Sequence, residues 1–192
     1  MSATVPRPGT IQDYWNPEDE AFWESQGKSV ANRNLWISIP ALHLSFAVWL
    51  MWSAMVVKMG DIGFKFTPDQ MFMLAAAPGL AGATLRLPMS FVVPIFGGRN
   101  VTVVMTALLL LPCIGLGLAI QDPATSFTHF LILGILAGIG GGNFSASMSN
   151  ISNFFPKKMA GTALGLNAGL GNLGVSMTQL VTPLVILLPI AG

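Results

Sequence analysis

Arg86 is the residue with the clearest capacity for chemistry, because it is the only charged residue in the range 70–98. A guanidinium at the centre of a membrane helix costs about 2.5–3.5 kcal/mol on insertion scales, so a charge kept there indicates a functional site. On a helix, Gly79, Gly82 and Ala83 share its face, which lets another helix or a cavity approach closely. The sequence therefore predicts an anion site. The alternative is an arginine that reaches the membrane surface or pairs with carbonyl groups.

Two residues of later apolar stretches could complete this site. Asn172 lies within the stretch 159–190, where an amide away from water needs a partner. Phe144 could offer its ring to a flat ligand or to the guanidinium. A guanidinium has planar paired donors that match a planar oxyanion, and no second arginine or lysine cluster lies beside Arg86 for a polyanion. A small monovalent oxyanion is therefore the expected ligand.

Glycines recur at helical spacing in the same stretches and predict close helix packing. The three that we single out are Gly161, Gly165 and Gly171. Asparagines 143, 150 and 153 follow the helical repeat of the preceding stretch. The tryptophans of the first apolar stretch are interpreted as ordinary lipid-facing and packing surface.

Composition indicates a membrane protein. Apolar residues make up 53% of the 192 residues and charged residues only 9%, well below the usual quarter for soluble domains. The net charge of +1 gives no electrostatic case for binding nucleic acid, and the single cysteine excludes an internal disulfide. The spacing of nucleophiles, acids and histidines predicts no catalytic pair, cofactor or metal site, so an enzyme is not expected.

The predicted fold is all-α and polytopic, with a polar cytoplasmic segment over residues 1–34 and about five transmembrane helices over 35–192. Each predicted helix is long enough to cross a bilayer, with approximate bounds 35–57, 69–96, 101–120, 127–155 and 159–190. The second contains Pro78, Pro88 and Pro94, which are tolerated where neighbouring helices or water satisfy the freed carbonyl groups. Six basic residues lie on the same side of the membrane as the N-terminus, and two lie on the other side. This excess predicts a cytoplasmic N-terminus.

Two segments of the sequence resemble a known family. GNFSASMSNISNFFPKKMAGTALGLNAGLGNLG, over residues 142–174, resembles the signature of the nitrate/nitrite porter family, NarK-type, of the major facilitator superfamily. ATLRLPMSFVVPIFGG, over 83–98, resembles its arginine-bearing second helix. The resemblance extends over essentially the whole chain. FGGRN matches only the Gly-Arg part of the superfamily's loop between spans two and three and lacks its acidic residue.

The resemblance implies that Arg86 binds nitrate or nitrite, that Phe144 packs on the anion and that Asn172 hydrogen-bonds to it. It also implies nitrate/nitrite exchange by alternating access in the bacterial cytoplasmic (inner) membrane, with the glycine-bearing helices sliding during the conformational change. A full porter has twelve spans, so this chain corresponds to most of the N-terminal six-helix half. The expected partners are the lipid bilayer and the missing C-terminal half or a complementing chain. The alternatives are nitrate/proton symport and a non-transporting membrane module that scaffolds a partner.

Overall fold

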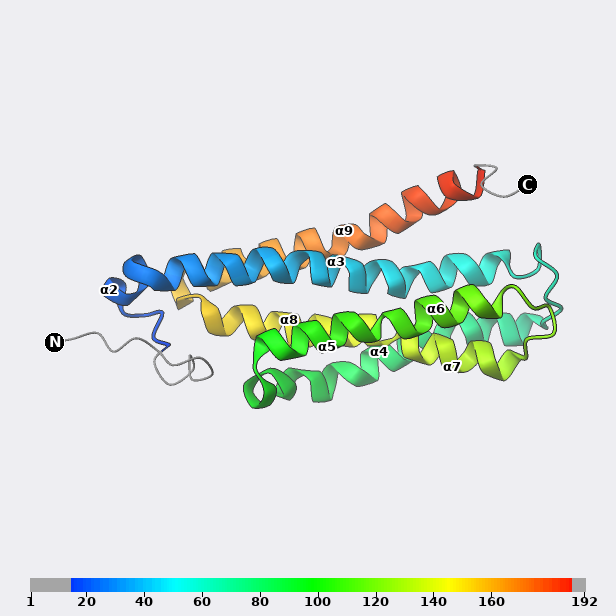
Figure 1. Cartoon of the computed structure of the whole chain (residues 1–192), viewed down its shortest axis with the longest axis horizontal. Coiled ribbons are helices and arrows are strands. Elements are labelled where there is room, and N and C mark those ends of the chain that lie inside the picture. The colour runs from blue at the N-terminus through cyan, green and yellow to red at the C-terminus, as the bar shows by residue number, and fades with distance from the viewer. Residues whose placement is uncertain (1–14, 188–192) are drawn as a thin grey trace.

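The structure is a computed structural model, and it describes residues 15–187. The described part is a bundle of long helices that run along one axis (Figure 1). In chain order the elements are α2 (Glu20–Phe22), the π-helical segment η1 (Trp23–Gly27), α3 (Lys28–Lys58), α4 (Pro68–Phe96), α5 (Gly98–Leu108), α6 (Leu110–Ala119), α7 (Phe127–Ala137), α8 (Ile139–Phe154) and α9 (Lys157–Leu187). Over these residues no strand is present, which confirms the predicted all-α fold.

Four helical stretches of the described residues are long and apolar enough to cross a membrane: Glu20–Lys58, Pro68–Phe96, Gly98–Ala119 and Phe127–Phe154. The polytopic membrane prediction is therefore confirmed. The predicted fifth span corresponds to α9, a helix of 31 residues that is not among these four. Its apolar residues alternate with glycine, asparagine, serine and threonine, which lowers its apolar character.

The first long helix begins earlier than the boundary predicted between residues 34 and 35. Helical structure is continuous from Glu20 to Lys58, and 39 residues at 1.5 Å each give roughly 58 Å, about twice the hydrocarbon thickness. The Asp19 carboxylate caps its start by accepting from the amides of Ala21 and Phe22. Residues 20–34 are thus an extension of the first span. Residues 1–14 of the predicted segment lie outside the described residues.

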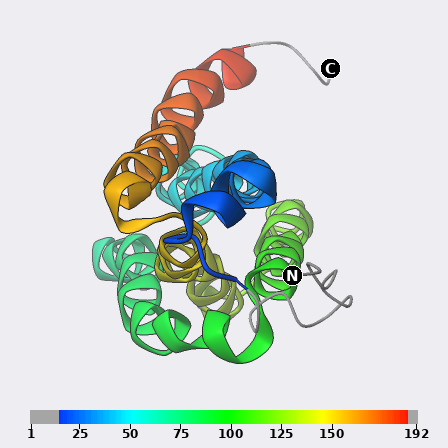
Figure 2. The same ribbon diagram turned by 90° about the vertical axis from the view of Figure 1, so that its left-hand side faces the viewer.

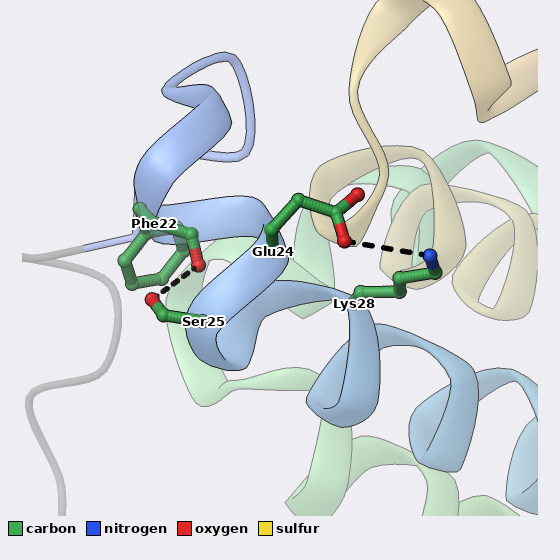
Figure 3. A network of polar contacts seen from close by, with 4 residues as sticks. All are labelled: Phe22, Glu24, Ser25 and Lys28. Atoms are coloured by element: carbon green, nitrogen blue, oxygen red, sulfur yellow. Dashed lines mark hydrogen bonds and ion pairs between the residues drawn. The ribbon is translucent and has the colours of Figure 1, made fainter.

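The π-helical segment carries local polar contacts on its exposed side (Figure 3). The Ser25 hydroxyl donates to the Phe22 carbonyl at 3.1 Å, and Lys28 pairs with Glu24 at 3.6 Å. The opposite side of this region packs on the turn between α8 and α9. There the Trp23 ring lies 5.8 Å from that of Phe155. The N-terminal part of the helix is therefore anchored against the end of the bundle.

Two predicted spans each contain an irregular turn in the middle, although each remains one helical stretch. Span three divides into α5 and α6 at Leu109, because Pro112 has no N–H for the carbonyl of Leu108 and its ring crowds that carbonyl. Span four divides into α7 and α8 at Gly138, whose N–H is shared among carbonyls of the preceding turn. Between α4 and α5, Gly97 takes a φ of +79°, a conformation that favours glycine.

Helix α8 lies at the centre of the bundle and packs against α3, α4, α5 and α9, as the end-on view shows (Figure 2). The C-terminal part of α9 diverges from α3 (Figure 1). The core side chains gather around Trp52 and Phe130 towards one end of the bundle and around Trp23 and Ile151 towards the other. Many large apolar side chains are exposed on the outer surfaces, as a bilayer requires.

The buried indole of Trp52 satisfies a carbonyl that a proline leaves without a partner. Pro78 cannot donate to the Leu74 carbonyl four residues earlier, and the Trp52 Nε1–H of α3 donates to that oxygen at 2.8 Å. We expect Trp52→Phe to lower the free energy of unfolding by about 1–3 kcal/mol, because it leaves a buried acceptor unpaired. Thermal unfolding in detergent would measure this loss.

The matched test is Pro78→Ala, which returns a backbone donor to the Leu74 carbonyl. In the Pro78→Ala background, Trp52→Phe should cost clearly less than in the wild type. Equal costs in both backgrounds would mean that the indole stabilises the bundle through packing and not through this hydrogen bond.

Candidate functional site

The Arg86 side chain is half-buried on α4, where it faces α8 and α3. Its Nε–H donates to the Gly141 carbonyl of α8 at 3.2 Å. Its guanidinium carbon lies 5.1 Å from the centre of the Phe144 ring and 5.9 Å from that of Trp49. Of the two ion pairs among the described residues, neither includes Arg86. The charge is therefore stabilised by a carbonyl dipole and two aromatic rings, with no carboxylate to neutralise it.

Glycines allow the backbones of α4 and α8 to come close enough for this hydrogen bond. A Cβ at Gly82 would lie 3.1 Å from the Gly138 carbonyl oxygen and 3.2 Å from the Gly141 Cα, so any side chain there would push the helices apart. Gly79, which the helical repeat places on the same face, meets nothing within 4 Å. The close approach is thus restricted to the turn of α4 directly before Arg86.

In the structure Phe144 lies beside Arg86. The Phe144 ring belongs to a group of three aromatic side chains. Phe46 of α3 lies 5.9 Å from Phe144 and 5.9 Å from Trp49, measured between ring centres. The sequence interpretation assigned the tryptophans of the first span to lipid and packing, and it missed Trp49. The available signal was Ser45, a polar residue four positions earlier on the same helix face. In the structure Ser45 and Trp52 are both buried, which turns this side of α3 inward.

Asn172 is not brought to Arg86 in the described structure. Its side chain is exposed on α9, and its amide donates to the Ala168 carbonyl of the same helix at 3.0 Å. The inward face of α9 carries Asn167, Gly171 and Gly174, and one residue further along a helix turns by about 100°. A contact between Asn172 and the anion therefore remains a prediction.

Buried asparagines join the central helices through serine hydroxyl groups. Asn143 of α8 donates to Ser45 of α3 at 2.7 Å, and Asn167 of α9 donates to Ser147 of α8 at 2.9 Å. Asn150 donates to Asn34 at 3.1 Å and to Ser38 at 3.3 Å. Asn153 is exposed. These amides hold α3, α8 and α9 together, and Asn167 is a second residue that the sequence interpretation missed.

The predicted glycines of α9 occupy two different environments. A Cβ at Gly171 would lie 2.6 Å from Leu42 Cδ2, so this glycine lets α9 pack closely on α3. Gly161 and Gly165 are exposed and meet nothing within 4 Å. Their part in helix packing or conformational change remains a prediction. Within residues 15–187 no three His, Cys, Asp or Glu side chains are grouped closely enough to hold a metal ion.

Comparison with known proteins adds the family context. The profile of the Major Facilitator Superfamily matches residues 32–189. The chain is 57% identical over 176 residues to the nitrate/nitrite transporter NarU of Salmonella typhimurium, and 56% identical over 176 residues to NarU of Escherichia coli; each alignment covers 92% of this chain and 38% of the relative. It is 48% identical over 178 residues to the probable nitrate/nitrite antiporter NarK2 of Thermus thermophilus, covering 93% of this chain and 40% of the relative. The chain thus spans 38–40% of the length of these relatives.

Proposed function

The chain belongs to the major facilitator superfamily, and we propose that it forms the N-terminal, anion-binding part of a nitrate/nitrite transporter. The observation that carries this proposal is the guanidinium of Arg86, half-buried within a membrane-spanning helix and without a carboxylate partner among the described residues. A charge in this position is costly, and a bound anion would compensate it. The names of the relatives, which are nitrate/nitrite transporters, support the same substrate.

The chemistry of the site favours a small planar oxyanion. A guanidinium matches a planar anion through parallel N–H···O hydrogen bonds, whereas a polyanion would require more positive charge than Arg86 supplies. The Phe144 ring, 5.1 Å from the guanidinium carbon, offers an apolar face beside the bound ion. Nitrate and nitrite, each planar and monovalent, fit both features.

The same charge favours exchange over net transport. When no anion is bound, the uncompensated guanidinium must stay close to water, so enclosing an empty site within the protein is costly. A bound nitrate or nitrite removes this cost and permits the rocking of two helix groups that characterises alternating access. In this mechanism each reorientation carries an anion, which gives one-for-one exchange.

We propose a bacterial cytoplasmic membrane location with the N-terminus in the cytoplasm. Figure 1 shows that α2, the turn between α4 and α5 and the start of α9 gather at one end of the bundle. That end carries most of the basic residues: Lys28, Arg33, Arg99, Lys157 and Lys158. At the opposite end of the bundle, Lys58 is the last residue of α3 and Lys65 lies in the loop that follows. An excess of basic residues on the cytoplasmic side is the usual arrangement of membrane proteins.

Counterflow in proteoliposomes tests the proposal. The chain is joined to the C-terminal helices of the Escherichia coli NarU relative, which we call the completed transporter. Labelled nitrate should enter vesicles loaded with nitrite and should not enter vesicles without an internal anion. We expect an imposed pH gradient to leave this uptake unchanged.

Each other outcome identifies a different function. Uptake into empty vesicles that is driven by an inward proton gradient would replace exchange by nitrate/proton symport. No nitrate response under any condition, together with correct folding, would favour a module that scaffolds a partner.

A further inference from the structure

We infer that Trp49 and the glycine contact between α4 and α8 are positioning elements that direct the terminal Nη1–Nη2 edge of Arg86 towards the anion. This inference rests on the proposed function and concerns how the guanidinium is oriented. It assigns a role to Trp49, Gly82 and Gly141, which lie on three different helices.

The orientation follows from the hydrogen bond that the arginine already makes. A guanidinium can bind an oxyanion through two edges, one formed by Nε–H with an Nη–H and the other by the two Nη groups. In this structure Nε–H donates to the Gly141 carbonyl at 3.2 Å. The first edge is therefore partly occupied by the protein. Among the described residues no group accepts from the terminal edge, which keeps both of its donors for an anion.

The glycine contact determines whether this hydrogen bond can form. Gly82 lies one helical turn before Arg86, and a Cβ there would come within 3.2 Å of the Gly141 Cα. Gly82→Ala should therefore move α4 away from α8 by several tenths of an ångström or more. The bond from Nε to the Gly141 carbonyl would lengthen beyond its present 3.2 Å, and the guanidinium would lose its fixed orientation.

Trp49, which belongs to α3, also restricts the orientation of the guanidinium. Its ring centre lies 5.9 Å from the guanidinium carbon, within the range of a cation–π interaction. Gly141 also governs this contact, because a Cβ at that position would lie 3.1 Å from the Trp49 Cε2 atom. The Gly141 position thus both accepts the Nε hydrogen bond and leaves room for the indole.

A fixed terminal edge has a consequence for selectivity. Two parallel N–H groups can bond separately to two oxygens of nitrate or nitrite, whereas a spherical halide presents a single centre. Loss of orientation should therefore weaken nitrate binding more than chloride binding. A purely structural role for Trp49 or Gly82 would weaken both equally.

The test uses four single variants of the completed transporter in proteoliposomes. Trp49→Leu removes the aromatic face and Trp49→Phe keeps one. Gly82→Ala disrupts the close contact between α4 and α8, and Gly79→Ala is the same change at a position of α4 where a Cβ meets no neighbour. The measurements are KM and kcat for nitrate/nitrite counterflow and inhibition of this counterflow by chloride. Fluorescence-detected size-exclusion chromatography monitors folding.

We expect Trp49→Leu and Gly82→Ala to raise the nitrate KM about 10-fold, the scale of one cation–π or charged hydrogen bond. The ratio of chloride to nitrate affinity should rise in both. Trp49→Phe and Gly79→Ala should stay within about 3-fold of the wild type, because one keeps an aromatic ring and the other meets no neighbour.

The inference would be overturned if folded Trp49→Leu kept the wild-type KM and chloride ratio, or if the phenylalanine and leucine variants behaved alike. Should Gly82→Ala fail to fold, the two Trp49 variants decide the question by themselves. If the wild-type protein itself showed no nitrate transport, the proposed function would fail, and that result is distinct from any difference between the variants.

Discussion

Arg86→Ala in the completed transporter is expected to abolish nitrate/nitrite counterflow, with a loss of at least about 100-fold in kcat/KM. Two charge-assisted hydrogen bonds, each of about 1.5–3 kcal/mol, correspond to a factor of roughly 10² to 10⁴. Arg86 is the only charged residue in the range 70–98, so no other cation on α4 near this position can replace the guanidinium. Labelled nitrate uptake into nitrite-loaded proteoliposomes measures the effect.

Arg86→Lys should also lose most of the activity. A lysine keeps the positive charge but presents it as a point, without the planar pair of donors and without an Nε–H for the Gly141 carbonyl. If lysine restored more than about half of the wild-type rate, charge alone would explain the site and the bidentate geometry would be unnecessary.

Arg99→Ala is the matched control for both variants. Arg99 is exposed in the first turn of α5 and makes no ion pair among the described residues. Its replacement should change the nitrate KM by less than about 2-fold, because an exposed charge contributes little to a distant site. Equal sensitivity of transport to Arg86→Ala and Arg99→Ala would contradict an anion site at Arg86.

Gly140→Leu is expected to prevent stable folding, with a loss of about 3 kcal/mol or more in the free energy of unfolding. A Cβ at this position would collide with the Ser45 carbonyl of α3 and would lie 3.2 Å from the Trp49 Cβ. A backbone carbonyl in the middle of a helix cannot rotate away, so α3 and α8 would have to separate. The measurements are the thermal midpoint and the monodispersity of the purified protein in detergent.

Gly117→Leu provides the comparison for this variant. Gly117 is an exposed glycine in an apolar helix, and a Cβ there meets nothing within 4 Å. A leucine should be tolerated, since it gains helix propensity and faces open space. A comparable loss of stability in both variants would show that the leucine side chain itself, and not the contact between α3 and α8, is responsible.

The amino-acid sequence by itself determined the fold class and the identity of the central charge. Composition and the length of the apolar stretches are local quantities, and they were enough to predict an all-α membrane bundle. They also isolated Arg86, because a single charge in a long apolar stretch is visible without any knowledge of its neighbours. At Pro78 a neighbouring helix supplies the partner for the freed carbonyl, because Trp52 of α3 donates to Leu74.

Only the tertiary structure decided which face of each helix meets which neighbour. The helical repeat groups residues by face but does not say whether that face is covered, so Gly79 and Gly82 looked equivalent although only Gly82 touches α8. For the same reason Asn167 is buried against Ser147 while Asn172 is exposed on α9. Trp49 lies near Arg86 because α3, α4 and α8 pack against one another, although these helices are far apart in the chain. The physical reason is that composition and periodicity are properties of one segment, whereas a binding site forms where several segments meet.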